Sequence, residues 1–322
     1  MSDELIACMN ELETKFELLA QKLIQLKESQ SLYLGRNILP NDNAVSQKLM
    51  FDNISIRYEG KAIKSKDLMN YGFRVFSQND EDGIILAIFA LIGFKNKKAL
   101  EIGSNCSNSE IGLPENCSAN LAVNHNWHTT IIDIDKLACD QLTYFYARNM
   151  SSMHFHHISD EINAYYNPLI INKGVSPNNI ESLCTDFGLE ENIDLIIVDI
   201  DGEDFDVVKN IICFKPRVLV VEFEKRFGGN VSVYQKSRSD FNTEFSQSGT
   251  VSLLAWENFL KVHGYSLIAV NSTCFNAFFI LDSENQGKIE VTTSKQIFVE
   301  HNAFCRVKSD FWLEPTESWS KF

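Results

Sequence analysis

The sequence predicts an α/β protein with a doubly wound, mostly parallel β-sheet. Three apolar segments that end in carboxylates are expected to be parallel strands: 98–103, 128–134 and 193–198. The third contains four consecutive apolar residues, which indicates a strand buried on both faces. About thirty residues separate the starts of the first two strands, which is the length of one βαβ unit.

The last part of this sheet is expected to be antiparallel. A further apolar strand at 216–224 again ends in carboxylates. After a helix at 251–263, the strands 265–271 and 274–281 are joined only by a short turn. Because a parallel pair needs a long crossover, these two strands must form an antiparallel hairpin. The tail, 284–322, is expected to pack back on the domain.

Other segments fill the spaces between these strands. A polar start followed by an apolar run predicts a helix at 77–92, with its acidic residues near the positive end of the helix dipole. Three histidines at 153–158 suggest a metal site, but their alternation with apolar residues favours a third strand with one wetter face. Pro177 starts another helix, which runs to Phe187. The polar segment 225–250 is read as a lid or an acceptor-binding insert.

Composition narrows the functional class. The chain has 322 residues, a formal net charge of −14 and a pI near 5.0, so sequence-independent binding to nucleic acid or anionic lipid is disfavoured. Its eight cysteines include no CxxC pair, which indicates neither a zinc site nor a disulfide framework. The sequence shows no signal peptide and no apolar stretch of transmembrane length, and a reduced, cytoplasmic protein is expected.

The N-terminal segment, 1–34, is expected to be a coiled-coil helix. Apolar residues recur there with alternating spacings of four and three: Leu5, Met9, Leu12, Phe16, Leu19, Leu23 and Leu26. A helix with such a stripe needs a partner, either the body of the same molecule or another copy of the chain. The regular seam favours self-association through residues 5–26. Residues 35–72 are interpreted as a linker and lead-in to the domain at 73–283.

Carboxylates cluster where the predicted parallel strands end. Asp133, Asp199, Asp201 and Glu222 would share one edge of the sheet. Like charges brought together repel, and either a metal ion or a positively charged ligand would relieve that repulsion. Alternatively, some of these acids cap the helices that follow.

Six short motifs follow one another over about residues 73–282: Ser77–Gly83, Glu101–Gly103, the helix from Asn116 to Trp127 with Asp133 after it, Asp199–Asp204, Pro216–Glu222, and Ser252–Tyr265 followed by Asn276–Phe279. In this order they resemble the FkbM-like branch of class I S-adenosylmethionine-dependent methyltransferases. The sequence departs from the family pattern at Asn105, Ser107 and Asn126. Because it lacks the three-glycine dinucleotide fingerprint, a nicotinamide enzyme is disfavoured.

The resemblance implies a Rossmann-like sheet and S-adenosylmethionine as cofactor. It places the methionine end of the cofactor against Glu101 and the backbone of Gly103–Asn105, and both ribose hydroxyls against Asp133. Ser159 and Asp160 would meet the adenine. The full set of expected cofactor-binding residues is Gln78, Glu101, Gly103, Ser104, Asn105, Asp133, Ile134, Ser159, Asp160 and Asp199.

A hydroxyl acceptor is a poor nucleophile and needs a base or a metal ion to take up its proton. Asp199, Asp201 and Glu222 are therefore expected either to bind Mg²⁺ through oxygen or to act directly as the base. His128 is a second candidate for the base.

The leading hypothesis is an O-methyltransferase that acts on a sugar hydroxyl of a bacterial surface glycan or glycolipid. Methylation of a secondary metabolite is an alternative. Another is a catalytically inert module that assembles a glycan-synthesis complex through its coiled coil.

Overall fold

A computed structural model describes the chain at residues 15, 42–104, 114–149, 166–188, 193–235, 250–301, 312–315 and 319–322. Contacts divide the chain into two units, Met1–Asp42 and Asn43–Phe322. Apart from Lys15 and Asp42, which are helical, the first unit lies outside the described residues, and so does the predicted coiled-coil seam.

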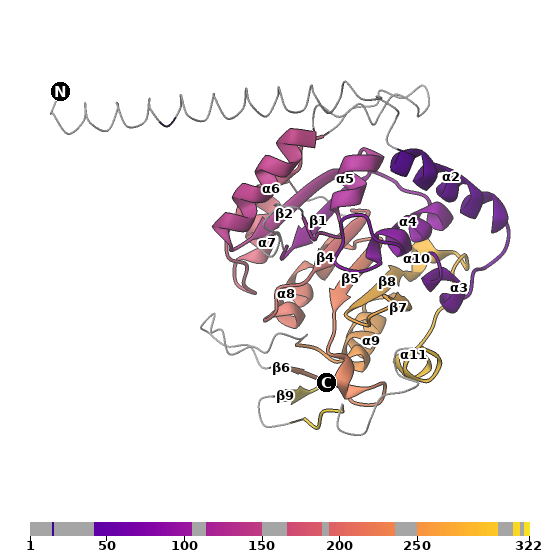
Figure 1. Cartoon of the computed structure of the whole chain (residues 1–322). Helices are drawn as coiled ribbons and strands as arrows, with labels where there is room; N and C mark the ends of the chain where they lie inside the picture. Colours follow the sequence, from indigo (N-terminus) through magenta and orange to yellow (C-terminus); the bar gives the residue numbers. More distant parts are fainter. Residues whose placement is uncertain are drawn as a thin grey trace. The chain divides into compact units, whose positions relative to one another are not determined.

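A seven-stranded sheet in the order β3-β2-β1-β4-β5-β8-β7 forms the centre of this unit (Figure 1). Its strands are β1 (Lys98–Ile102), β2 (His128–Asp133), β3 (Leu169–Asn172), β4 (Leu195–Val198), β5 (Val218–Glu222), β7 (Tyr265–Val270) and β8 (Asn276–Leu281). The first five are parallel, whereas β8 is antiparallel to both β5 and β7. The predicted Rossmann-like, mostly parallel sheet with a C-terminal hairpin is therefore confirmed.

Helices cover both faces of the sheet (Figure 1). On one face the core includes residues of α2 (Asp42–Arg57), α3 (Ser65–Met69), α4 (Glu81–Ile92), α5 (Ala119–His125) and α6 (Lys136–Asn149). On the other it includes residues of α7 (Ile180–Asp186), α8 (Asp204–Ile211) and α9 (Leu253–Val262). Since both faces are covered, every residue of β4 and β5 is buried, which explains why both strands are apolar except for Glu222 at the end of β5.

Helix α4 is buried along its whole length. All twelve of its residues are buried, in agreement with the apolar run that follows its acidic start. Its acidic start does not act as a simple helix cap. Asp82 instead accepts hydrogen bonds from the backbone N–H groups of Val75, Phe76 and Ser77 at 2.7–2.9 Å, and so fixes the loop that leads into the helix.

The outer neighbour of β2 is β3, at Leu169–Asn172, a strand that is not predicted from the sequence. The strand expected at 153–158, with its histidines, lies outside the described residues. Only one of the four residues of β3 is buried. Its first three residues are apolar, but so short a run does not distinguish a strand from an irregular segment.

Two segments outside the main sheet contribute more than their sequence suggests. Residues 42–72, interpreted as linker and lead-in, place Ile54, Ile63 and Leu68 in the core. Within the polar segment 225–250, a short helix η2 (Lys225–Phe227) and a strand β6 (Val233–Gln235) are described.

Several further elements complete the described structure. Strand β6 pairs with β9 (Trp319–Lys321), so one end of the tail packs on this unit. The remaining elements are η1 (Ile212–Phe214), α10 (Asp282–Asn285) and α11 (Ser294–Glu300). Among the described helices, none combines the length and the apolar character that crossing a membrane requires.

Candidate functional site

A cavity of about 530 Å³ opens at the carboxyl ends of β1, β2, β4 and β5. The strand order reverses between β1 and β4, and open α/β sheets bind ligands at such a reversal. The lining of the cavity includes seven carboxylates: Glu81, Glu101, Glu115, Asp133, Asp199, Asp201 and Glu222. Lys173 is the one basic residue among its described lining residues. The cavity is therefore suited to a ligand that carries positive charge.

Gly103 allows the ends of β1 and β4 to approach each other. It has a φ of +80°, and a Cβ atom placed on it would lie 1.6 Å from the carbonyl oxygen of Asp199. Its N–H donates to the carbonyl of Ile132 at 2.9 Å. The turn after β1 therefore requires glycine, because both the backbone angle and the neighbouring carbonyl exclude a side chain.

Gly103→Ala is expected to destabilise the fold by about 2–4 kcal/mol, from left-handed strain together with a clash against backbone. Gly264→Ala is the matched control, since Gly264 has a φ of +81° and no atom within 4 Å of a built Cβ. The control isolates the strain, about 1–2 kcal/mol. Urea denaturation measures both variants, and an equal loss in the two would contradict the proposed close approach.

Asp133, at the end of β2, is a fixed acceptor in the cavity wall. Its Oδ2 accepts from the backbone N–H of Ser104 at 2.8 Å and from the Ser104 hydroxyl at 3.3 Å. Its Oδ1 accepts from the N–H of Asp135 at 2.6 Å. Burial raises the pKa of Asp133, whereas these hydrogen bonds act in the opposite direction. Beside it, the apolar side chain of Ile134 lines the cavity and is 61% exposed.

Glu101, on β1, connects the cavity floor to the start of α5. Its carboxylate accepts from the backbone N–H groups of Cys117 at 2.8 Å and Ser118 at 3.0 Å, and from the Ser118 hydroxyl. Burial raises the pKa of Glu101 to about 7, although these hydrogen bonds favour the charged form. Glu101 therefore has a structural role in addition to facing the cavity.

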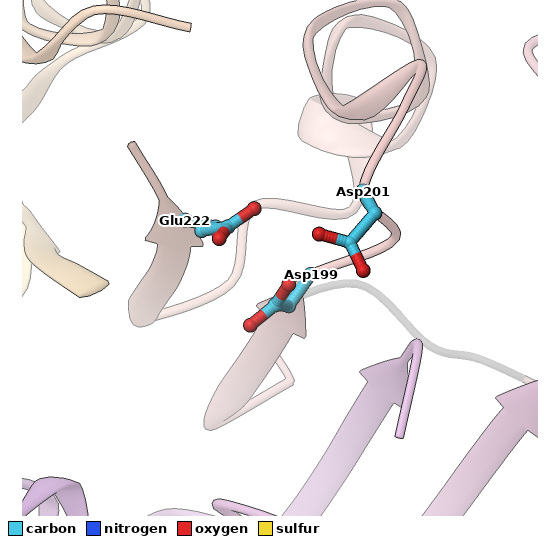
Figure 2. Close-up of side chains that lie close together, drawn as sticks. All are labelled: Asp199, Asp201 and Glu222. Carbon is cyan, nitrogen blue, oxygen red and sulfur yellow. The ribbon is translucent and has the colours of Figure 1, made fainter. Parts of the chain in front are cut away.

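Asp199, Asp201 and Glu222 form a carboxylate cluster in which one oxygen from each residue lies within 4.8 Å of the others (Figure 2). Asp199 follows β4, and Glu222 is the last residue of β5. Asp201 belongs to the turn after β4 and has a φ of +52°. Figure 2 shows the three side chains converging from these two neighbouring strand ends. The sequence predicted this grouping from the strand ends alone.

The neighbouring Asp204 has a different role. Its carboxylate accepts from the N–H groups of Ile200 at 2.9 Å and Gly202 at 3.1 Å, and from the Thr250 hydroxyl at 3.0 Å. It thereby fixes the turn that carries Asp199 and Asp201. Because the two N–H groups precede α8, and the N-cap residue Glu203 makes no capping hydrogen bond with its side chain, the alternative that these acids cap the helices that follow is not supported at α8.

The cluster is electrostatically unfavourable by itself. Burial raises the pKa of Asp199 and of Glu222 well above the usual range, and the neighbouring carboxylates raise both further. The pKa of Asp201 is raised in the same way, by burial and by Asp204. Glu222 Oε2 is buried and has no hydrogen-bond partner among the described residues. A cation bound here would satisfy that oxygen and offset the repulsion.

The structure does not bring every predicted residue to the cavity. Gln78, Ser104 and Ile134 line it, whereas Asn105, Ser159 and Asp160 lie outside the described residues.

His128 requires a correction. It is the first residue of β2, at the opposite end of that strand from Asp133. Its ring is exposed and lies 3.5 Å, centroid to centroid, from that of Tyr166. Because the length of the strand separates it from the cavity, His128 is not placed to act as the base.

Sequence reasoning missed several lining residues, among them Glu81, Glu115, Lys173, Phe275 and Asn276. From the sequence, Glu81 has a place in the Ser77–Gly83 motif and at the start of a helix, but no place in the site. Lys173 follows β3, a strand that is not predicted from the sequence. Asn276 belongs to a motif that carried the family resemblance, but its position beside β5 depends on strand pairing.

Comparisons with known proteins give distant structural matches. No protein-family model matches the sequence, and neither does any curated protein. Among solved structures, a glycopeptide N-methyltransferase, MtfA, has 6% identity and a TM-score of 0.36, over 66% of this chain and 95% of that one. A TehB-like SAM-dependent methyltransferase from Corynebacterium glutamicum has 12% identity and a TM-score of 0.32, over 73% and 99%.

A third structure, a SAM-dependent methyltransferase from Thiobacillus denitrificans in complex with S-adenosyl-L-homocysteine, has 10% identity and a TM-score of 0.30. That similarity covers 63% of this chain and 71% of that chain. None of these matches assigns a function to the chain.

Proposed function

We propose that the chain is an S-adenosylmethionine-dependent methyltransferase that methylates a hydroxyl group, and that the acceptor is a sugar of a bacterial surface glycan or glycolipid. The main support for this proposal is the acid-lined cavity at the reversal of strand order. The Gly103 turn and Asp133 border this cavity. Gly103, Asp133 and the carboxylates beyond them provide what a cationic nucleoside ligand needs: backbone access, an acceptor for hydroxyl groups and negative charge.

Different residues of the cavity would contact different parts of such a cofactor. Asp133 would accept hydrogen bonds from the ribose, and the exposed side chain of Ile134 would cover the face of the base. Glu101 and the carboxylates near it would surround the positively charged methionine end. When bound, this cofactor supplies a methyl group that is already activated by its attachment to a sulfonium.

The hydrogen bonds of Asp133 limit how it can take two hydroxyl groups. A carboxylate has about four acceptor positions, and Ser104 and Asp135 already use three of them. The long 3.3 Å bond from the Ser104 hydroxyl is the weakest of the three, and that hydroxyl rotates freely. Asp133 therefore accepts a second ribose hydroxyl if Ser104 Oγ turns away.

The carboxylate cluster would deal with the proton of the acceptor hydroxyl. A carboxylate with a raised pKa is a better base at neutral pH than an ordinary one, so Asp199 fits the role of base. Alternatively, Asp199, Asp201 and Glu222 would hold Mg²⁺, which prefers oxygen ligands and would lower the pKa of a bound hydroxyl. Both versions place the acceptor oxygen beside these three residues.

Asp133→Ala is expected to weaken cofactor binding at least about tenfold, because it removes charge-assisted hydrogen bonds worth about 1.5–3 kcal/mol each. Calorimetric titration with S-adenosylmethionine measures the affinity. Asp140→Asn is the control, because Asp140 lies on α6, is 63% exposed and pairs only with Lys136 among the contacts described here. If Asp133→Ala binds as tightly as the wild type, the cofactor does not occupy this cavity in the proposed way.

Methyl transfer itself is tested by mass spectrometry of candidate glycans incubated with the chain and cofactor. The proposal predicts a gain of one methyl group on oxygen. Methylation of nitrogen only would contradict the hydroxyl acceptor while leaving the cofactor site intact.

A further inference from the structure

We propose that Asn276 provides a fourth oxygen ligand for a divalent cation bound by Asp199, Asp201 and Glu222, and that Glu81 positions the Asn276 amide for this purpose. The inference rests on the metal-bound version of the proposed function. It adds Asn276 as a neutral ligand beside the carboxylate cluster and Glu81 as the residue that orients it.

Strand pairing places Asn276 beside the cluster. It is the first residue of β8 and lies directly opposite Glu222, the last residue of β5. Directly opposed residues of an antiparallel pair project from the same face, with their Cβ atoms about 4.5–5.5 Å apart. Both residues line the cavity, and both are at least nine-tenths buried, at 5% and 6% exposed.

Glu81 determines which end of the Asn276 amide faces the cavity. Asn276 Nδ2 donates to Glu81 Oε1 at 3.1 Å, and Asn271 Nδ2 donates to the same oxygen at 2.7 Å. The other Glu81 oxygen accepts from the N–H of Asn79 at 2.9 Å. Because a carboxylate oxygen only accepts, the NH₂ group of Asn276 must face Glu81, which leaves Oδ1 on the other side.

The oxygen that remains has no partner. Asn276 Oδ1, like Glu222 Oε2, is buried without a hydrogen bond among the described residues. Two opposed acceptors that face one cavity require a donor or a cation, because a buried polar atom left unpaired costs about 1–3 kcal/mol. The nearby Lys225 does not provide this donor. Its ammonium group donates to the carbonyl of Thr273 and lies 3.6 Å from the centroid of the Phe275 ring.

The chemistry of the four groups fits a hard divalent cation. Mg²⁺ takes about six oxygen ligands, so four from the protein leave two positions for water or the acceptor. A neutral amide oxygen adds a ligand without adding charge to a cluster in which neighbouring carboxylates already raise the pKa of Asp199 and Glu222. In the metal-free chain, an asparagine at this position therefore adds less repulsion than a fourth acid would.

Binding of Mn²⁺, followed by electron paramagnetic resonance on the full chain, tests this assignment without reference to turnover. Asn276→Ala is expected to weaken Mn²⁺ affinity about tenfold or more. Glu81→Gln is expected to do the same, although Glu81 does not contact the cation, because its new amide no longer imposes one orientation on Asn276. Asn276→Asp keeps an oxygen and should bind Mn²⁺ at least as tightly as the wild type.

Asn210→Ala is the control. Asn210 Nδ2 donates to the backbone carbonyls of Pro177 and Asp206, and the residue does not line the cavity. Calorimetry with S-adenosylmethionine on the same samples shows whether each variant is folded and whether the cofactor site is intact. If Asn276→Ala does not fold, the other two variants test the assignment. Weaker Mn²⁺ binding in Glu81→Gln, together with undiminished binding in Asn276→Asp, supports it, and equal binding in both overturns it.

The outcomes separate the two proposals. A wild type that binds S-adenosylmethionine and Mn²⁺, with equally tight Mn²⁺ binding in Asn276→Ala and Glu81→Gln, overturns only the role of Asn276. Cofactor binding without Mn²⁺ binding overturns the cation site but leaves a carboxylate as the base. Loss of cofactor affinity in Asn276→Ala, with unchanged Mn²⁺ affinity, assigns Oδ1 to the cofactor instead. No saturable cofactor binding by the folded wild type overturns the proposed function itself.

Discussion

Asp199→Asn is expected to lower the methyl-transfer rate by at least about 100-fold while changing cofactor affinity little, because it removes the base or a metal ligand and retains the shape of the side chain. The same substitution is expected to raise thermal stability in the absence of metal. Burial and neighbouring carboxylates raise the pKa of Asp199 well above its usual range, so its charged form destabilises the folded state.

The direction of this stability effect follows from linkage. Because the pKa of Asp199 is higher in the folded chain than in the unfolded one, its favourable contribution is complete below the unfolded pKa and is lost as pH rises through the folded pKa. At neutral pH and above, an uncharged asparagine avoids that loss. Thermal unfolding at several pH values should therefore show Asp199→Asn gaining stability relative to the wild type as pH increases.

Asp140→Asn, at a 63% exposed position on α6 that does not line the cavity, is the control for both measurements. If Asp199→Asn retains full activity, Asp199 is neither base nor essential metal ligand. If it is both inactive and less stable than the wild type without metal, the description of the cluster as electrostatically strained is wrong.

Arg217→Met is expected to destabilise the fold by about 3–5 kcal/mol, because it leaves a buried carboxylate without its partner. Arg217, which precedes β5, is 3% exposed, and its guanidinium donates to Asp194 at 2.6 Å and to Glu284 at 2.8 Å. Two backbone carbonyls, of Ile92 and Gly93, also accept from it. Asp194 further accepts from three backbone N–H groups, those of Lys95, Asn96 and Lys97.

The Lys136–Asp140 pair provides a matched comparison. Its N–O distance of 2.7 Å is close to that of Arg217 and Asp194, but its side chains are 75% and 63% exposed. Lys136→Met is expected to cost no more than about 1 kcal/mol, because exposed pairs contribute little. Urea denaturation gives both values. A similar small loss in Arg217→Met would mean that the buried network does not hold this end of the sheet together.

The arrangement of strands was predictable because the central strands are buried on both faces. A strand covered on both faces has to be largely apolar, and β4 and β5 are apolar except for Glu222 at the end of β5. The carboxylates that follow such runs must then meet at one edge of a parallel sheet. For this reason Asp133, Asp199, Asp201 and Glu222 could be grouped from the sequence alone.

The parts of the site that depend on strand pairing and strand direction could not be predicted. The apolar run of β3 is only three residues long, too short to predict a strand, so the sequence does not point to Lys173 after it. Asn276 lies beside Glu222 only through the register of β5 and β8, and β8 also pairs with β7 across an irregularity between Leu267 and Ala269. His128 was chosen for its chemistry, but the direction of β2 places it at the wrong end of the strand.

A crystal structure of the chain with bound S-adenosylhomocysteine would show whether the acid-lined cavity holds the cofactor. We expect a ribose hydroxyl within hydrogen-bond distance of Asp133, the homocysteine end against Gly103 and Glu101, and the sulfur facing Asp199. A nucleoside bound elsewhere on the chain, with the cavity filled only by water, would contradict it.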